Sequence, residues 1–129
     1  ARRTFSMART TERFFLSLPR AHVIRASGRL WYPPADVYRT RDGWMVVLEL
    51  AGVSDEEIEV EVEGATLNVS GSRRDGYCTE TVFCHQLEIT YSRFEKTVHF
   101  PCPIESASVE REYERGLLIL RLRSPEFCE

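Results

Sequence analysis

The chain has 129 residues, of which 43% are hydrophobic and 29% charged, and a formal net charge of -3, a balance typical of one soluble domain with an ordinary core. No run of about 18 apolar residues is present, which excludes a membrane-spanning helix. The sequence also lacks the apolar segment that a secretion signal contains. We therefore expect a cytoplasmic protein with no membrane partner.

Charge is unevenly divided along the chain. Residues 1–30 contain seven arginines and one glutamate, a net charge of +6, and the residues after them carry a net charge of -9. We predict that residues 1–33 are an N-terminal arm, flexible or partly helical, whose first six residues are a leader before a native Met7. A basic arm can bind nucleic acid, but no nucleic-acid-binding motif accompanies it, and we expect no such partner.

Residues 34–123 are typical of an all-β sandwich. Short alternating apolar runs are separated by glycine, proline or charged turns, as in strands with one buried face. Met45 and Val47 make the second face of their strand apolar as well. The seven to eight predicted strands lie near residues 36–40, 44–50, 58–63, 67–71, 81–84, 91–100, 107–113 and 117–122. Residues 124–129 are predicted to be a short tail.

The acidic strand is the clearest of these. Its alternation places three apolar side chains inward and four acids toward solvent: Ile58, Val60 and Val62 against Glu57, Glu59, Glu61 and Glu63. Before it, Ser54 and Glu57 have the spacing of a capping box, which predicts one helical turn over residues 54–57. We interpret the glutamates as a solvated face that resists edge pairing and not as a metal site.

The sequence contains no recognisable catalytic machinery. Lys96 is the single lysine and lies in neither a P-loop nor a recognisable Schiff-base context, and the three histidines are scattered along the chain. Hydrolase, zinc-protease and dinucleotide-binding motifs are absent from the sequence. We predict no enzymatic activity, no cofactor and no bound metal.

The cysteines lack the C-x-x-C spacing of zinc and redox motifs, and we expect reduced thiols at Cys78, Cys84, Cys102 and Cys128. Residues 72–90 form the longest stretch without a clear pattern, which predicts an exposed functional loop. Redox pairing of Cys78 with Cys84, or between subunits, is therefore an alternative. A metal site at Cys84 and His85 is another, although neighbours on a strand point to opposite faces.

Three segments together carry a family resemblance: PPADVYRTRDGWMVVLELAGVSDEEIEVEVEGATLNVSGSRR, RFEKTVHFPCPI and EYERGLLILRL. They resemble the α-crystallin domain of bacterial and plant-type small heat-shock proteins, over roughly residues 33–123. The resemblance implies an immunoglobulin-like β-sandwich that acts without ATP as a holdase. Such a protein binds partially unfolded clients and suppresses their aggregation under heat or other stress.

The resemblance also implies how subunits meet. The expected unit is a homodimer in which the loop at residues 72–90 extends a strand, at Val82 and Phe83, onto the sheet of the neighbour, and higher oligomers are built from it. Composition adds an expected client surface in the arm, where apolar side chains lie among the arginines. These are Phe14, Phe15, Leu16 and Leu18.

A partner groove is implied as well, accepting an I-x-I-type C-terminal motif of another dimer. Its expected lining is Ile58, Val60, Val62 and Val109. Residues 124–129 contain no such motif, which argues against large cages built through it. The chain departs from the pattern of the family it resembles at two positions, where Arg111 replaces a usually small residue and Arg115 replaces the usual asparagine before Gly116. Two other readings stay open: an adaptor sandwich that docks on one partner, and a redox- or metal-regulated binding module.

Overall fold

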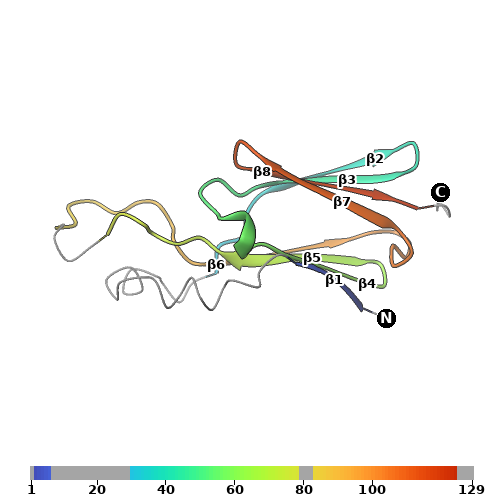
Figure 1. The fold of residues 1–129 in the computed structure, drawn as a ribbon, viewed down its shortest axis with the longest axis horizontal. Coiled ribbons are helices and arrows are strands. Elements are labelled where there is room, and N and C mark those ends of the chain that lie inside the picture. The colour runs from blue at the N-terminus through green and yellow to red at the C-terminus, as the bar shows by residue number, and fades with distance from the viewer. Residues whose placement is uncertain (1, 7–29, 79–82, 125–129) are drawn as a thin grey trace.

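The computed structural model describes residues 2–6, 30–78 and 83–124. They form two four-stranded antiparallel sheets that pack face to face (Figure 1). One sheet has the order β1-β4-β5-β6 and the other β2-β3-β8-β7. The strands are β1 (Arg2–Ser6), β2 (Ala35–Thr40), β3 (Gly43–Glu49), β4 (Glu59–Glu63), β5 (Thr66–Ser72), β6 (Arg93–His99), β7 (Ser108–Glu114) and β8 (Leu117–Arg123). The predicted all-β sandwich is confirmed.

The core lies between the two sheets because strand alternation turns one apolar face of each sheet inward. Each fully buried aliphatic or aromatic side chain contributes about 1.5–3 kcal/mol. Phe94 packs edge-on against Trp31, with ring centres 5.8 Å apart. The largest side chains with less than 2% exposure are Phe94, Leu48, Leu50, Ile58, Leu67, Ile104, Leu118, Leu120, Leu122, Val46, Val60 and Val62.

Two glycines permit close approach and tight turning in the second sheet. A Cβ atom at Gly43 would lie 1.8 Å from the Leu122 carbonyl oxygen on β8. Gly116 has φ +79°, and Arg115 before it also has a positive φ of 54°. Both central residues of the β7–β8 hairpin are therefore left-handed, as in the type I′ turn, which favours asparagine and glycine. Arg115 adopts this conformation despite its side chain.

Tyr113 links β7 to the turn after β3. Its hydroxyl lies 2.7 Å from the Leu50 carbonyl oxygen and 2.8 Å from that of Val53. The single hydroxyl proton is shared between these two acceptors. Burial raises the pKa of Tyr113 because the phenolate loses hydration, and the hydrogen bond to Val53 partly offsets this.

The structure corrects two details of the acidic segment. The predicted helical turn is present as η1 (Asp55–Glu57), but Ser54 makes no side-chain capping bond. Glu57 is buried, at 5% exposure, and does not share the solvent face with Glu59 and Glu63. The cause is that Glu57 lies in the 3-10 turn, where the alternation of the strand has not begun.

The N-terminus also differs from expectation. Residues 2–6, predicted to be a leader, form β1 and pair antiparallel with β4, from Arg2 opposite Glu63 to Ser6 opposite Glu59. The remainder of the arm up to residue 29 lies outside the described residues. In the part of the chain that the structure describes, no helix is long and apolar enough to cross a membrane.

Candidate functional site

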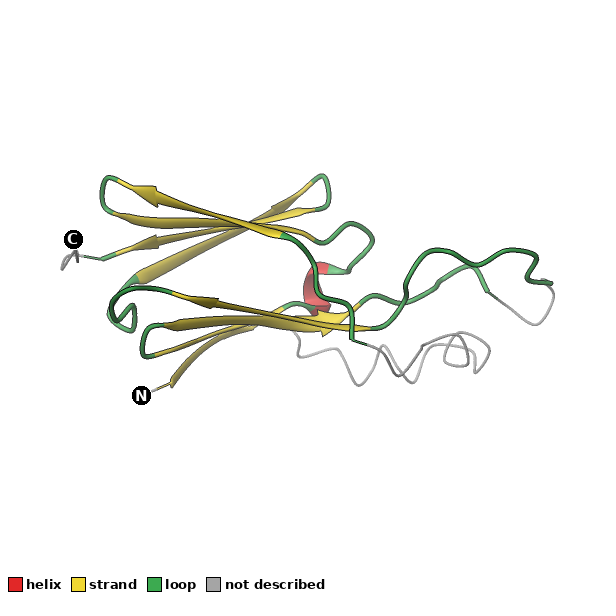
Figure 2. Cartoon of the chain, turned by 180° about the vertical axis from the view of Figure 1, so that it is seen from behind, coloured by secondary structure: helices red, strands yellow, loops and turns green. Residues whose placement is uncertain are grey.

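The long loop, residues 73–92, leaves one end of the sandwich between β5 and β6 (Figures 1 and 2). Arg73 fixes its base. The guanidinium donates two hydrogen bonds to the Thr90 carbonyl oxygen, of 2.9 and 2.7 Å, and one of 3.2 Å to that of Ala51. Its carbon lies 3.7 Å from the centre of the Trp31 ring. Arg73 therefore joins both ends of the loop to the segment that follows the arm.

The next two residues add further anchors. Arg74 Nη2 lies 3.4 Å from Oε2 of the buried Glu57 and so links the loop to η1. Asp75, only 2% exposed, accepts hydrogen bonds from the backbone N–H groups of Tyr77 (2.8 Å) and Cys78 (3.2 Å). A side chain that accepts from amides two and three residues on fixes a turn. The loop thus begins on an ordered base.

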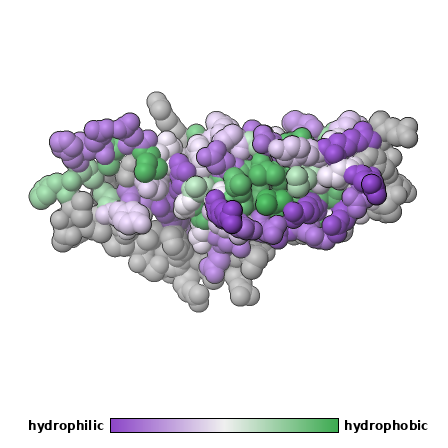
Figure 3. All heavy atoms as spheres, turned by 90° about the horizontal axis from the view of Figure 1, so that it is seen from above, coloured by the Kyte–Doolittle hydropathy of each residue, from purple (hydrophilic) through white to green (hydrophobic). Residues whose placement is uncertain are grey.

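Apolar side chains are exposed farther along the loop. Phe83 is 96% exposed and Tyr77 84%, and Leu87 and Ile89 are also exposed. They line a shallow pocket together with Cys78 and Cys84. Figure 3 shows hydrophobic surface at the end of the molecule from which this loop extends. Such surface on one protruding element is a candidate for contact with another chain.

The second sheet carries an outer apolar patch, which we define as Tyr38, Met45, Val47, Leu117 and Ile119. The register places Tyr38 opposite Met45, and Val47 opposite Ile119, on the face away from the core. Figure 3 shows this face, with hydrophobic surface at its centre and charged surface around it. Arg121 and Glu112, 3.0 Å apart, form part of that charged rim.

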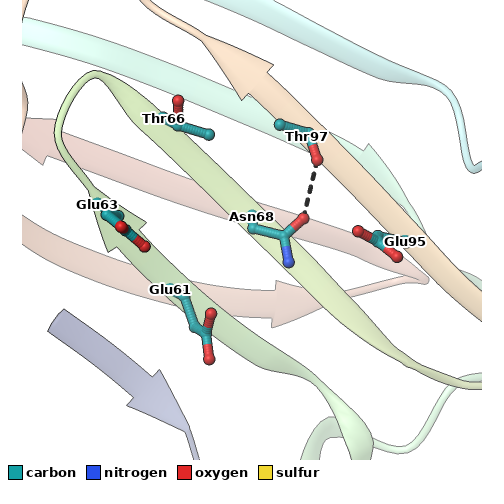
Figure 4. A pocket seen from close by; sticks show the side chains of 6 residues that line it. All are labelled: Glu61, Glu63, Thr66, Asn68, Glu95 and Thr97. Atoms are coloured by element: carbon teal, nitrogen blue, oxygen red, sulfur yellow. Dashed lines mark hydrogen bonds between the residues drawn. The ribbon is translucent and has the colours of Figure 1, made fainter. Parts of the chain in front are cut away.

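The outer face of the first sheet is acidic and polar instead. Figure 4 shows a shallow pocket lined by Glu61, Glu63, Thr66, Asn68, Glu95 and Thr97. The Thr97 hydroxyl donates to Asn68 Oδ1 at 2.9 Å. Among the described residues, no group of three or more histidine, cysteine or acidic side chains is arranged to hold a metal ion. The charges on this face disfavour contact of the first sheet with apolar surfaces of other molecules.

The predicted groove residues lie on β4, at the position just before it and on β7, the edge strand of the second sheet, and Arg111 on β7 reaches the Ile58 carbonyl oxygen. Ile58, Val60 and Val62 are fully buried, and Val109 is half-buried and packs on the core. The side of β4 that does not pair with β5 is occupied by β1. These side chains are therefore core residues, and their role in binding a partner stays a prediction.

Arg111 crosses one end of this groove. From β7 it donates to Asp55 Oδ1 at 2.8 Å and to the Ile58 carbonyl oxygen at 3.3 Å. The pairing of β1 with β4 ends at Glu59, the residue after Ile58. Arg111, in place of the usual small residue, thus adds an ion pair between β7 and η1 and donates to the carbonyl oxygen of the residue just before β4.

Comparison with known proteins decides the family. The sequence model of the Hsp20/alpha crystallin family matches residues 36–127. The chain belongs to this family. The match contains the whole sandwich except β1 and the first residue of β2, so the family resemblance is confirmed over the segment that carried it. Family membership supports a chaperone role, and Hsp20 proteins are in general not enzymes.

Individual Hsp20 proteins agree with this assignment. The 22.0 kDa heat shock protein of Arabidopsis thaliana is 30% identical over 94 residues, which cover 70% of this chain and 48% of that protein. Small heat shock protein C2 of Rickettsia felis is 21% identical over 94 residues, 73% of this chain and 61% of that protein. The chain thus spans about half the length of these relatives.

Solved structures show the same fold. Heat shock protein 16.0 of Schizosaccharomyces pombe superposes with a TM-score of 0.68 at 26% identity, covering 77% of this chain and 92% of that chain. The hspA protein of Xanthomonas axonopodis has a TM-score of 0.63 at 23% identity, covering 75% of this chain and 97% of that chain.

The other predicted residues of this Hsp20 chain fall in different places. Phe83 is exposed in an irregular part of the long loop, and Val82, beside it, lies outside the described residues. The arm residues are outside them as well: Phe14, Phe15, Leu16 and Leu18. Sequence reasoning missed the anchors at Arg73, Arg74 and Asp75. A charged run directly after β5 was their one signal.

The cysteines depart in part from the expectation of reduced thiols. Cys102 is disulfide-bonded. Cys78 and Cys84 carry thiols, and their Sγ atoms lie 3.5 Å apart. The sequence offered the pairing of Cys78 with Cys84 as an alternative, whereas the disulfide at Cys102 was not predicted, because its formation depends on how the chain folds.

Proposed function

We propose that this Hsp20 chain is an ATP-independent holdase, which binds partially unfolded client proteins and suppresses their aggregation under heat or other stress. The observation that carries the proposal is family membership combined with exposed apolar surface on a stable sandwich. Unfolding clients expose apolar segments, and burying these against the chaperone removes them from water. Charged rims and acidic faces keep the chaperone itself dispersed.

The arm is the client surface that we propose, through Phe14, Phe15, Leu16 and Leu18. Its support is compositional: apolar side chains among arginines in a segment of net charge +6. The outer apolar patch is a second surface of suitable character. Because the patch lies on a rigid sheet, it would favour extended segments that lie flat on it.

A heat-aggregation assay tests the holdase. A thermolabile client is warmed with the chain, without nucleotide, and light scattering is followed. We expect scattering to fall with increasing chaperone. Undiminished scattering at several-fold excess contradicts the proposal. Deletion of residues 1–30 tests the arm, and unchanged protection would move the client site to the outer apolar patch, where Ile119→Lys would then reduce protection.

We further propose a homodimer in which the strand around Val82 and Phe83 pairs with the β2 edge of the neighbour. In the first sheet, β1 covers β4, and Trp31 forms a parallel bridge with Phe94 on β6. In the second sheet β7 carries a row of glutamates, which disfavours pairing. β2 offers an edge with Val37 and Tyr38 exposed, and this is the better template for an added strand.

The ladder between β2 and β3 supplies a sharp test. The Glu49 N–H donates to the Pro34 carbonyl oxygen at 3.1 Å. Along an antiparallel ladder, hydrogen-bonded pairs alternate with non-hydrogen-bonded pairs. Pro34 and Glu49 form a hydrogen-bonded pair, so Val37, three residues after Pro34, belongs to a non-hydrogen-bonded pair. The N–H of Val37 therefore points away from β3 toward the open edge. Val37→Pro removes this outward donor and leaves the β2–β3 bonds in place.

We expect Val37→Pro to convert the dimer to a folded monomer, measured by light scattering and circular dichroism. Val37→Thr, which keeps both the N–H and the preference for a strand, is the matched control and should remain dimeric. A Val37→Pro variant that stays dimeric would contradict the role of β2. A wild-type chain that is monomeric would favour the adaptor reading.

The groove between β4 and β7 is proposed as a second contact, for a strand supplied by another subunit. Its support is the β1 strand, which shows that the β4 edge accepts an antiparallel partner. Higher oligomers would then require β1 to be displaced from this edge. Deletion of residues 1–6 should therefore increase the mean mass measured by light scattering if β1 and a partner strand compete.

A further inference from the structure

Two thiols in the long loop are close enough to react with each other. The Sγ atoms of Cys78 and Cys84 are 3.5 Å apart, and a disulfide requires about 2.05 Å. A shift of about 1.5 Å, within the range of a side-chain rotation, therefore suffices to form the bond. Cys84 is exposed and Cys78 is half-buried, so that a small oxidant in solution can reach the pair.

One of the thiols is held in position by the anchored base of the loop. The backbone of Cys78 donates to the buried Asp75 carboxylate, and Asp75 follows directly on Arg73 and Arg74, which contact the sandwich. Cys84 lines the same shallow pocket as Cys78, and its Sγ atom points to the Cys78 Sγ atom 3.5 Å away. The turn at Asp75 therefore fixes the Cys78 side of the pair.

A Cys78–Cys84 disulfide and an extended strand through the same residues exclude each other. Six residue steps separate the two cysteines, and a strand rises about 3.3 Å per residue, which places their Cα atoms about 20 Å apart. A disulfide requires Cα atoms no more than about 6.8 Å apart. The bond would enclose Val82 and Phe83, the residues proposed for the exchanged strand.

We infer that Cys78 and Cys84 form a redox-modified dithiol whose oxidation blocks strand exchange between subunits. The inference rests on the proposed homodimer. With the chain reduced, the segment is able to extend onto β2 of the neighbour. With the disulfide formed, the segment is held as a short ring, and its N–H and C=O groups cannot match a straight strand edge.

The oxidant is a low-molecular-weight disulfide such as oxidised glutathione. The thiolate of one cysteine attacks a glutathione sulfur, which forms a mixed disulfide and releases one glutathione thiolate. The second cysteine then attacks the protein sulfur of this mixed disulfide and releases the second glutathione. In all, two protein thiols become one disulfide and one oxidised glutathione becomes two reduced glutathione molecules, with the two protons carried by the products.

The test uses the full chain, equilibrated with mixtures of reduced and oxidised glutathione, quenched with acid and alkylated. Trypsin cuts after Arg74 and Arg93, and the peptide between these cuts contains both cysteines. An internal disulfide leaves this peptide unalkylated and lighter by two hydrogen atoms than its reduced form. We expect this species to increase with the oxidised fraction as the mean mass by light scattering falls by half.

Variants separate the possible outcomes. Cys78→Ser and Cys84→Ser each remove the internal bond with little change in shape, and both should stay dimeric at every glutathione ratio. Absence of the internal disulfide in the wild-type peptide overturns the inference, and so does a disulfide that leaves the dimer intact or links two chains. A chain that is already monomeric in reductant contradicts the proposed homodimer, and with it the inference that oxidation blocks strand exchange. In that case the tryptic peptide between Arg74 and Arg93 still shows whether Cys78 and Cys84 are oxidised to a disulfide.

Discussion

Replacing Arg73 tests whether one side chain holds the long loop to the sandwich. Arg73→Ala removes three hydrogen bonds, to the carbonyl oxygens of Thr90 and Ala51, and the contact with the Trp31 ring. Arg73→Lys keeps the charge above the ring but cannot reproduce the planar fork of the guanidinium, which bonds two acceptors at once.

The expected loss follows from these contacts. A hydrogen bond from a charged donor contributes about 1.5–3 kcal/mol and a cation above an indole about 0.5–2 kcal/mol. Thr90 is exposed and its carbonyl oxygen regains water in the variant, so we expect about 2 kcal/mol in total for Arg73→Ala. In a domain of this size each kcal/mol corresponds to ~4–8 °C in Tm. The predicted decrease in Tm is therefore ~8–16 °C, and Arg73→Lys should lose about half of it.

Calorimetry measures the midpoint, and Arg115→Lys is the matched control. The Arg115 side chain is 88% exposed and forms an ion pair with its neighbour Glu114 at 3.7 Å, so the Tm of Arg115→Lys should differ from that of the wild type by less than about 2 °C. If the Tm of Arg73→Ala also stays within about 2 °C of the wild type, the three hydrogen bonds do not stabilise the domain. The conclusion that Arg73 anchors the base of the loop would then be wrong.

Three further predictions concern the sandwich. Arg74→Met should lower the free energy of unfolding in urea by about 3 kcal/mol, because the buried Glu57 carboxylate loses the Arg74 guanidinium. Adding Glu57→Leu should restore most of this stability. A double variant no more stable than Arg74→Met would contradict the ion pair. Gly71→Ala places a Cβ atom 2.1 Å from the Glu57 carbonyl oxygen and 2.8 Å from the Phe94 ring, so we expect about 3 kcal/mol of destabilisation by overpacking, and an unchanged urea midpoint would refute the clash. Tyr113→Phe should cost about 1 kcal/mol at pH 7. Because the folded pKa of Tyr113 lies above its unfolded value of about 10, its contribution is full below pH ~10 and is lost as pH rises through the folded pKa; a Tm difference between wild type and variant that does not shrink above pH ~10 would contradict this.

Local alternation was enough to predict most of the sandwich. Val60 and Val62 are buried as their period of two requires, and Met45 and Val47 form the second apolar face that their strand predicted. Gly116 turns the last hairpin. These features depend on neighbours within a few residues, which the sequence displays directly.

Contacts between distant residues could not be predicted in the same way. The partners of Arg73 lie 17 and 22 residues away, and Arg111 bonds to Ile58, 53 residues away. Glu57 was assigned to the solvent face because the strand pattern was extended one residue too far into η1. The pairing of β1 with β4 was missed because RRTFS has no apolar alternation strong enough to indicate a strand.

The position of Trp31 sets an order of events during synthesis. Its N–H donates to the Arg93 carbonyl oxygen, and its own carbonyl oxygen accepts from Glu95, residues that the ribosome adds about 60 steps later. At roughly 5–20 residues per second this interval lasts about 3–12 s. Throughout it the indole ring has neither Phe94 nor the Arg73–Thr90 linkage to cover it. A nascent chain therefore carries the Trp31 side chain without these partners until β6 emerges.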